Sequence, residues 1–149
     1  DSLSIKCYMA DTGLFISHAF DDKGIVSEEV YLKILKDKLE MNGGMIIENI
    51  VAQMLRASGH KLFFFSSQSR TDKESRMEID FLISKAKVTS RHNISPIEVK
   101  STQRYTTNSL NKCIRKYGQY LDVPYVIHTA DYKIENGITY LPLYMTPLL

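Results

Sequence analysis

Two observations predict a single α/β domain with helices on both faces of a mixed sheet. From Met45 onward, segments with helical and strand-like hydrophobic periods follow one another in the order αβββαβ. The length of 149 residues suits one domain, and a composition of 44% hydrophobic and 24% charged residues excludes a mainly disordered chain.

Three helices are predicted from apolar residues at intervals of three and four positions. The first begins at Ser27, which can cap a helix, and is expected to break at Asn42-Gly-Gly44. The second runs from Met45 to Ala57 and the third from Thr107 to Leu121. The apolar stripe of the third helix comprises Leu110, Cys113, Ile114, Tyr117 and Leu121.

Strands are predicted where apolar residues form short runs or alternate with polar ones, at residues 62–66, 77–84, 94–100 and 123–129. In the second of these, one face is expected to carry Met77, Ile79, Phe81 and Ile83, and the other Glu78, Asp80 and Leu82. Residues 138–143 also alternate. They are expected to add an edge strand, which Pro142 and Pro147 keep at the periphery.

Several classes of protein are excluded by the signals that the sequence lacks. No apolar run reaches the roughly 18–20 residues that cross a bilayer, and no glycine-rich phosphate-binding loop is present. Cys7 and Cys113 stand far apart and the four histidines are scattered, so we expect no zinc site. We expect a cytoplasmic protein with reduced thiols, and, because the chain starts at Asp1, a fragment of a longer one.

Positive charge is concentrated in one part of the chain. Residues 85–116 contain eight basic residues and one acid, a net charge of +7, whereas residues 1–54 have a net charge of −4. Basic clusters of this kind bind phosphate backbones. The candidates for binding nucleic acid are Arg104, Lys112, Arg115 and Lys116, and the alternative is a solvated basic face.

Four polar residues are candidates for a metal-dependent site. Glu98 and Lys100 point to the same side of their strand, because residues two apart share a face. Asp80 lies in an apolar strand, where acids are depleted. If the two strands pair, the carboxylates of Asp80 and Glu98 meet and repel each other unless a cation such as Mg²⁺ intervenes. Lys100 can orient a water and stabilise developing charge, and Glu48 can face the sheet from its helix.

Purely structural interpretations of the same residues stay open. Glu48 is also compatible with an ordinary exposed position on its helix. Glu98 and Lys100 could form an ion pair of purely structural use.

In this order, Glu48, Asp80 and Glu98-x-Lys100 resemble the PD-(D/E)xK phosphodiesterase superfamily, which includes restriction endonucleases and archaeal Holliday-junction resolvases. A narrower resemblance is to the C-terminal domain of unknown function found in bacterial and archaeal AAA-type ATPases. It is carried by Tyr8-Met-Ala-Asp-Thr-Gly-Leu14, Glu48-Asn49, Glu78-Ile-Asp-Phe-Leu82 and Pro96-Ile-Glu-Val-Lys-Ser101. The resemblance covers roughly Ile5 to Leu143.

The resemblance implies a restriction-endonuclease-like mixed sheet with an αβββαβ core. The core would span residues 43–130, between an N-terminal helical extension (1–42) and a C-terminal tail (131–149). The implied activity is DNA phosphodiester hydrolysis that depends on Mg²⁺ or Mn²⁺. Asp80, Glu98 and the Val99 carbonyl would hold the metal, Lys100 would position the attacking water, and Glu48 would support the site or a second metal.

The implied partners are DNA, an upstream ATPase domain and, as in many nucleases of this fold, a second copy of the chain; no membrane is expected. The alternative function is that of a catalytically inactive nuclease-fold module, which binds DNA or protein and regulates the ATPase. Fold alone does not decide between these two functions.

Overall fold

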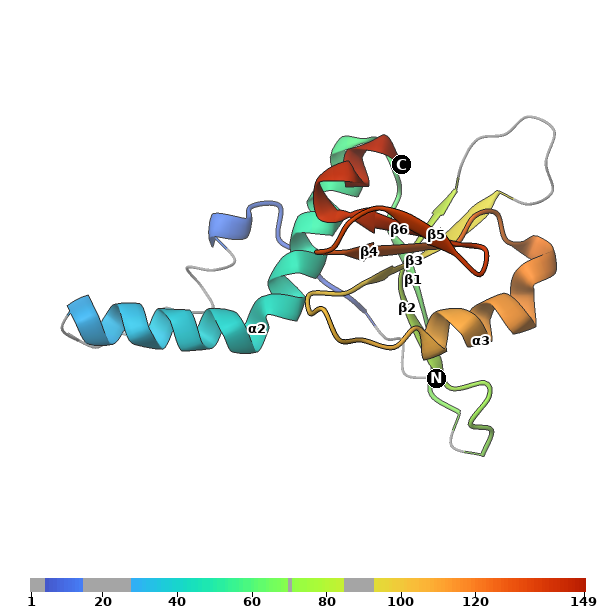
Figure 1. Cartoon of the computed structure of the whole chain (residues 1–149), viewed down its shortest axis with the longest axis horizontal. Helices are drawn as coiled ribbons and strands as arrows, with labels where there is room; N and C mark the ends of the chain where they lie inside the picture. Colours follow the sequence, from blue (N-terminus) through green and yellow to red (C-terminus); the bar gives the residue numbers. More distant parts are fainter. Residues whose placement is uncertain (1–4, 15–27, 70, 85–92) are drawn as a thin grey trace.

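The computed structural model describes residues 5–14, 28–69, 71–84 and 93–149, and of residues 28–42 the backbone alone. It confirms the α/β class with a six-stranded mixed sheet (Figure 1). The helices are α2 (Glu28–Ala57), α3 (Asn108–Tyr117) and the 3₁₀ helices η1 (Gly118–Tyr120) and η2 (Leu143–Leu148). The strands are β1 (Phe63–Ser67), β2 (Met77–Ser84), β3 (Ile94–Val99), β4 (Tyr125–His128), β5 (Lys133–Glu135) and β6 (Ile138–Pro142). None of the helices described is both long and apolar enough to cross a bilayer.

The strands lie in the order β1-β2-β3-β4-β6-β5. β1, β2 and β3 are antiparallel, whereas β3, β4 and β6 run parallel to one another. Helix α3 forms the crossover between the parallel strands β3 and β4, because parallel neighbours cannot be joined by a tight turn.

The prediction that residues 138–143 form a peripheral strand is wrong. β6 lies inside the sheet, between β4 and β5, and Pro142 is tolerated there as the last residue of the strand. The edge strand on this side of the sheet is β5, which pairs antiparallel with β6 and was not predicted. The turn between them is Asn136-Gly137, both with positive φ, and this dipeptide is itself a strong hairpin signal in the sequence.

The predicted break at residues 42–44 is also wrong, because α2 is one helix of 30 residues. A glycine inside a helix costs only about 1 kcal/mol, and ends a helix when it adopts a left-handed conformation. Neither Gly43 nor Gly44 does so; Gly59 does, with a φ of 91°. There the N–H groups of Gly59 and His60 bond back to the carbonyls of Arg56 and Leu55, which ends the helix in a Schellman motif.

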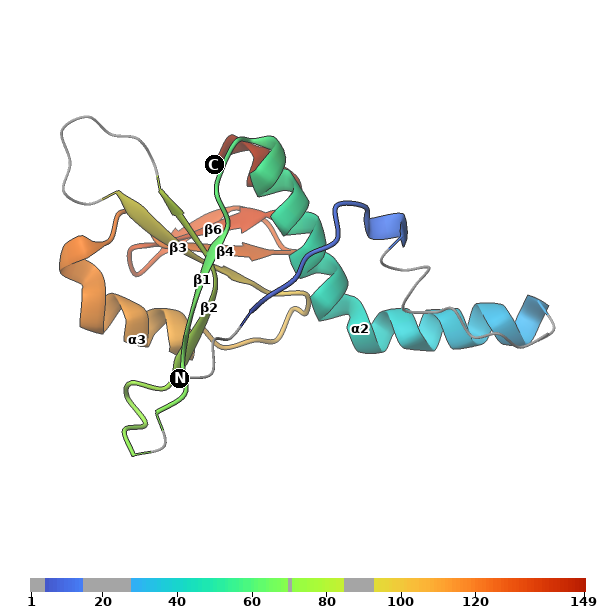
Figure 2. The same cartoon turned by 180° about the vertical axis from the view of Figure 1, so that it is seen from behind.

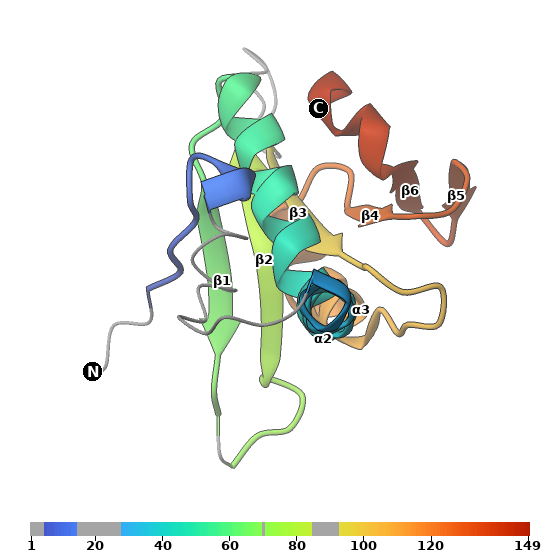
Figure 3. The same cartoon turned by 90° about the vertical axis from the view of Figure 1, so that its left-hand side faces the viewer.

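Helices cover both faces of the sheet, as predicted, and each face has its own apolar core (Figure 3). One core joins α2 to the sheet through Val51, Ala52, Leu55, Phe81, Ile83, Ile97, Tyr125, Ile127 and Leu141. The other joins α3 to the sheet through Met77, Ile79, Leu110, Cys113, Val126, Ile138 and Tyr140. The N-terminal half of α2 extends away from the sheet (Figure 2).

A β-bulge in β2 overturns the predicted alternation of that strand. Phe65 pairs with Ile79, but Phe63, two residues earlier in β1, pairs with Leu82, three residues later in β2. Asp80 and Phe81 therefore share one opposite position, as in a β-bulge. Before the bulge, Met77 and Ile79 pack in the α3 core. After it, Phe81 and Ile83 pack in the α2 core, so the strand changes faces at Asp80.

Candidate functional site

Asp80 is held at the point where β2 and β3 separate. The ladder between these strands ends at the pair Phe81–Ile97. Beyond it, the Asp80 carboxylate takes the place of the backbone: its Oδ2 accepts a hydrogen bond from the Val99 N–H at 2.8 Å. Asp80 thus lies against the peptide that joins Glu98 to Val99.

Glu98 is nearly fully buried, with 3% of its surface exposed. Its Oε1 accepts a hydrogen bond at 3.1 Å from the N–H of Leu110, in the first turn of α3, where backbone N–H groups have no partner inside the helix. Lys100 Nζ lies 3.2 Å from Oε2, which confirms that the two side chains share a face. This ion pair is not aligned as a hydrogen bond, and Oε2 has no hydrogen-bond partner within the described chain.

The electrostatics of this pair of carboxylates favour a cation. Burial raises the pKa of Asp80, and repulsion from Glu48 adds to it, although the Val99 N–H and Lys6 oppose the shift. Burial also raises the pKa of Glu98, and the Asp80 charge adds to it against the opposing effect of Lys100. A half-buried and a buried carboxylate that repel each other fit a hard divalent cation, although Lys100 already neutralises part of the charge on Glu98.

Glu48 joins Asp80 in space, as the sequence analysis expected, and is not an ordinary exposed helix residue. Its Oε1 accepts hydrogen bonds from Tyr8 Oη at 2.6 Å and from Lys6 Nζ at 3.1 Å. Lys6 Nζ also donates to Asp80 Oδ1 at 3.3 Å. The Glu48 and Asp80 carboxylates therefore converge on one ammonium group.

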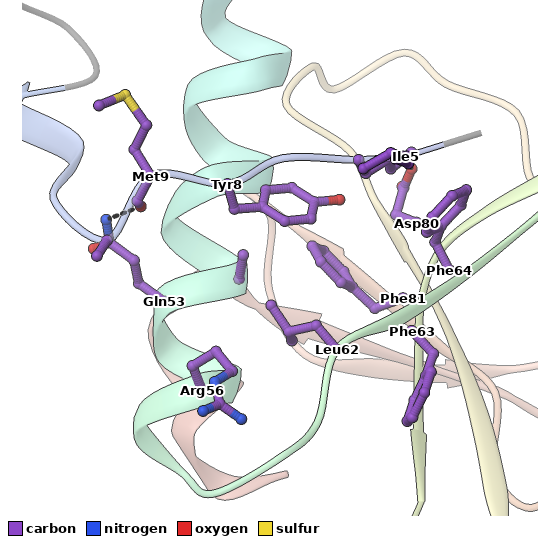
Figure 4. Close-up of a pocket in the computed structure, with 13 residues that line it drawn as sticks. Ile5, Tyr8, Met9, Gln53, Arg56, Leu62, Phe63, Phe64, Asp80 and Phe81 are labelled. Carbon is purple, nitrogen blue, oxygen red and sulfur yellow. Dashed lines mark hydrogen bonds and ion pairs between the residues drawn. The ribbon is translucent and has the colours of Figure 1, made fainter. Parts of the chain in front are cut away.

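Sequence reasoning missed the residues that bring the N-terminal segment to this site. Asn49 accepts a hydrogen bond from the Met9 N–H at 2.8 Å and donates to the Met9 carbonyl at 3.2 Å. Gln53 donates to the same carbonyl at 3.1 Å (Figure 4). Asn49 is buried in the middle of α2, and a polar residue at a buried helix position needs partners, which is the signal that could have identified it.

A cavity of about 610 Å³ lies beside Asp80, between the N-terminal segment, α2 and the start of β1. Its walls are mostly apolar, with the aromatic rings of Tyr8, Phe63, Phe64 and Phe81 (Figure 4). The rings of Tyr8 and Phe81 are 5.3 Å apart between centroids.

The predicted nucleic-acid-binding residues are only partly gathered. Lys112, Arg115 and Lys116 lie along α3 and contact the loop between β1 and β2: Lys112 through carbonyls, Arg115 through Glu74, and Lys116 through the hydroxyl of Ser75. Arg115 and Lys116 lie in the last turn of α3, about 8–9 Å along the axis from Leu110, whose N–H binds Glu98. Arg104 is exposed on the loop before α3. The remaining basic residues of this stretch, Lys85, Lys87 and Arg91, lie outside the described residues.

The donor set for a metal is small. Within the described ranges, no three side chains of His, Cys, Asp or Glu are grouped so that they could hold a metal ion. What the site offers is the two carboxylates of Asp80 and Glu98 and the Val99 carbonyl. Mg²⁺ commonly takes one or two carboxylates and completes its shell with water and substrate phosphate.

The raised pKa of Glu98 predicts a specific pH dependence of stability. Without metal, the native state holds the Glu98 proton more tightly than the unfolded chain does. The stabilisation from this bound proton is therefore complete below the ordinary pKa of a glutamate, and it is lost as pH rises through the raised pKa of the native state. Relative to Glu98→Gln, the unfolding free energy of the wild type should therefore fall over this window, by at most about 1.4 kcal/mol per pH unit.

This prediction is checked by urea denaturation with EDTA at a series of pH values. Glu135→Gln, which alters an exposed ion pair with Lys133, should follow the wild type at every pH. Parallel curves for the wild type and Glu98→Gln would contradict a raised pKa at Glu98.

The comparisons with known proteins place the chain in a family. The sequence model of a family described as "Domain of unknown function (DUF4143)" matches residues 43–146. No curated protein and no solved structure matches the chain significantly. Because the match covers more than half of the sequence, the chain belongs to this family. The matched range includes β5, β6 and most of η2.

Proposed function

We propose that this DUF4143 domain is a metal-dependent phosphodiester hydrolase with a restriction-endonuclease-like core. One observation carries the proposal: the β-bulge directs Asp80 onto the N–H of Val99, the residue that follows the buried Glu98 and precedes its ion-pair partner Lys100. Bulges of this kind re-aim side chains next to active sites. The arrangement joins two acids and a lysine from adjacent strands, which is what metal-assisted hydrolysis requires.

In the proposed site, Asp80, Glu98 and the carbonyl of Val99 hold Mg²⁺ or Mn²⁺. A bound divalent cation polarises a phosphoryl oxygen and lowers the pKa of a bound water. Lys100 orients the attacking water and stabilises the negative charge that develops on the phosphate. Glu48 adds negative charge beside Asp80, which strengthens the attraction for a cation.

The proposed substrate is DNA. Its phosphates would be bound by Arg104 and by the basic face of α3, whose Lys112 and Lys116 use uncharged partners and keep their charge available. We further propose that the domain follows an ATPase module in a cytoplasmic AAA-type protein and acts as a homodimer. These partners derive from the resemblance of the sequence motifs to ATPase-linked domains.

A second candidate function is an inactive module that binds DNA or protein and regulates the ATPase. The contact of Lys6 with Glu48 and Asp80 favours it, because an ammonium already neutralises part of the charge that a metal needs.

Mn²⁺ titration by calorimetry tests the proposal. We expect the wild type to bind Mn²⁺ and Asp80→Asn to bind at least tenfold more weakly, since the variant loses one of two carboxylate ligands. Glu135→Gln, on the far edge of the sheet, should bind like the wild type. Equal affinity in the wild type and Asp80→Asn would refute the proposal. So would the absence of binding, with and without duplex DNA, both in the wild type and in a variant that lacks the charge of Lys6.

A further inference from the structure

The side chain of Lys6 is surrounded by three carboxylates. Its Nζ lies 3.1 Å from Glu48 Oε1, 2.9 Å from Glu78 Oε1 and 3.3 Å from Asp80 Oδ1. These acids come from α2 and β2, whereas Lys6 comes from the N-terminal segment. Three negative groups on one ammonium leave the cluster with a charge of −2, so it still attracts positive charge.

Lys6 is held in this position by its neighbours. Tyr8 packs its ring on Phe81 and donates its hydroxyl to Glu48. At the next residue of the chain, the side chain of Asn49 binds both the N–H and the carbonyl of Met9. These contacts fix the backbone two and three residues after Lys6, so that ordering Lys6 costs mainly the rotamer entropy of its side chain.

Residues 5–9, which we name the N-terminal strap, form no strand with the sheet. Within the described chain, the backbone of the strap is held at Met9 by the side chains of Asn49 and Gln53. The strap can therefore leave without breaking a β-ladder. It also lines one side of the cavity beside Asp80, so its departure would open that side (Figure 4).

The ammonium and a metal ion compete for the same oxygens. Oδ2 of Asp80 is already engaged by the Val99 N–H, and Oδ1 by Lys6. A lysine is charged at neutral pH, and the three carboxylates within 3.3 Å hold the Lys6 ammonium against Asp80. The charge of Lys6 repels an incoming cation.

We propose that the N-terminal strap closes the candidate metal site, with the Lys6 ammonium held by Glu48 and Glu78 against the Asp80 oxygen that a cation would take. The inference rests on the proposed function, because Asp80 belongs to both sets of contacts. Divalent cations load when Lys6 withdraws, and the strap regulates the site by occupying it.

The test is the Mn²⁺ affinity of Lys6→Met, measured by calorimetry on the full chain. Methionine keeps much of the length of the side chain and removes the charge, so we expect binding at least tenfold tighter than in the wild type. Lys6→Arg keeps the charge and should stay within about twofold of the wild type. Lys133→Met removes a lysine from an exposed ion pair on β5 and should also bind like the wild type.

Lys6→Met leaves three carboxylates without their ammonium, so the variant is expected to be less stable without metal. Mn²⁺ should then raise its melting temperature more than that of the wild type. If Lys6→Met does not fold, Lys6→Gln, which can still donate hydrogen bonds, is measured in the same way.

The strap proposal is overturned if Lys6→Met, or Lys6→Gln in its place, binds Mn²⁺ no more tightly than the wild type. It is also overturned if that variant does not bind Mn²⁺ at all. Failure of the proposed function is recognised by a different result: in that case Asp80→Asn binds Mn²⁺ with the same affinity as the wild type.

Discussion

Replacing Lys100 by methionine should lower the rate of Mn²⁺-dependent cleavage of duplex DNA by about 10²–10³-fold, the usual effect of removing a group that stabilises transition-state charge. Lys100 is the cation paired with the buried Glu98, and it follows the proposed ligand Val99 in the chain. The rate is measured at saturating Mn²⁺ in single-turnover reactions, which separates the chemical step from metal binding.

The same variant needs a control for structure, because Glu98 then loses its ion-pair partner while it stays buried. Circular dichroism and Mn²⁺ titration show whether the site still forms, and we expect Mn²⁺ binding to persist. Lys133→Met should cleave at the wild-type rate. Cleavage by Lys100→Met at an unchanged rate would exclude the assigned role. A wild type that binds Mn²⁺ but cleaves no DNA would favour the regulatory module.

Replacing Phe81 by alanine should lower the free energy of unfolding by about 3–5 kcal/mol, as for other large aromatic residues in a core. Phe81 is 1% exposed and packs among residues of α2, β3 and β4, with Tyr8 on its ring. The free energy is measured by urea denaturation, with the slope compared between variants to confirm the same transition.

Phe63→Ala is the matched control, because Phe63 lines the same cavity but is 55% exposed. Its loss should cost less than about 1 kcal/mol, since most of the ring is already in water. The contrast also tests the bulge, which turns Phe81 toward α2 and Tyr8. Similar losses in the two variants would contradict that placement.

The sequence predicted well which side chains share a face within one helix or strand. The stripe of α3 holds as far as Tyr117, with Leu110 and Cys113 buried, because residues three and four apart share a helix face. The predicted extension to Leu121 is wrong, since α3 ends at Tyr117 and Leu121 forms a β-bridge with Ile94. The side-by-side placement of Glu98 and Lys100 holds for the same local reason, a period of two. In both elements, the pattern that predicts which side chains share a face lies within a few neighbouring residues.

The prediction failed where a local signal was open to more than one outcome. Gly43 and Gly44 can end a helix or pass through it, and the local sequence does not distinguish these outcomes. The alternation of β2 cannot show a bulge, because an inserted residue changes pairing with β1 and leaves the sequence pattern unchanged.

By itself, then, the sequence determined the class of the fold, the order of its main elements and the candidates Glu48, Asp80, Glu98 and Lys100. Tertiary structure alone decided that the Asp80 carboxylate reaches the Val99 N–H, and that Lys6 joins partners 42 and 74 positions away. The physical reason is that side-chain direction follows from local backbone geometry. Contacts between distant segments depend instead on how whole elements pack, and no local pattern records that.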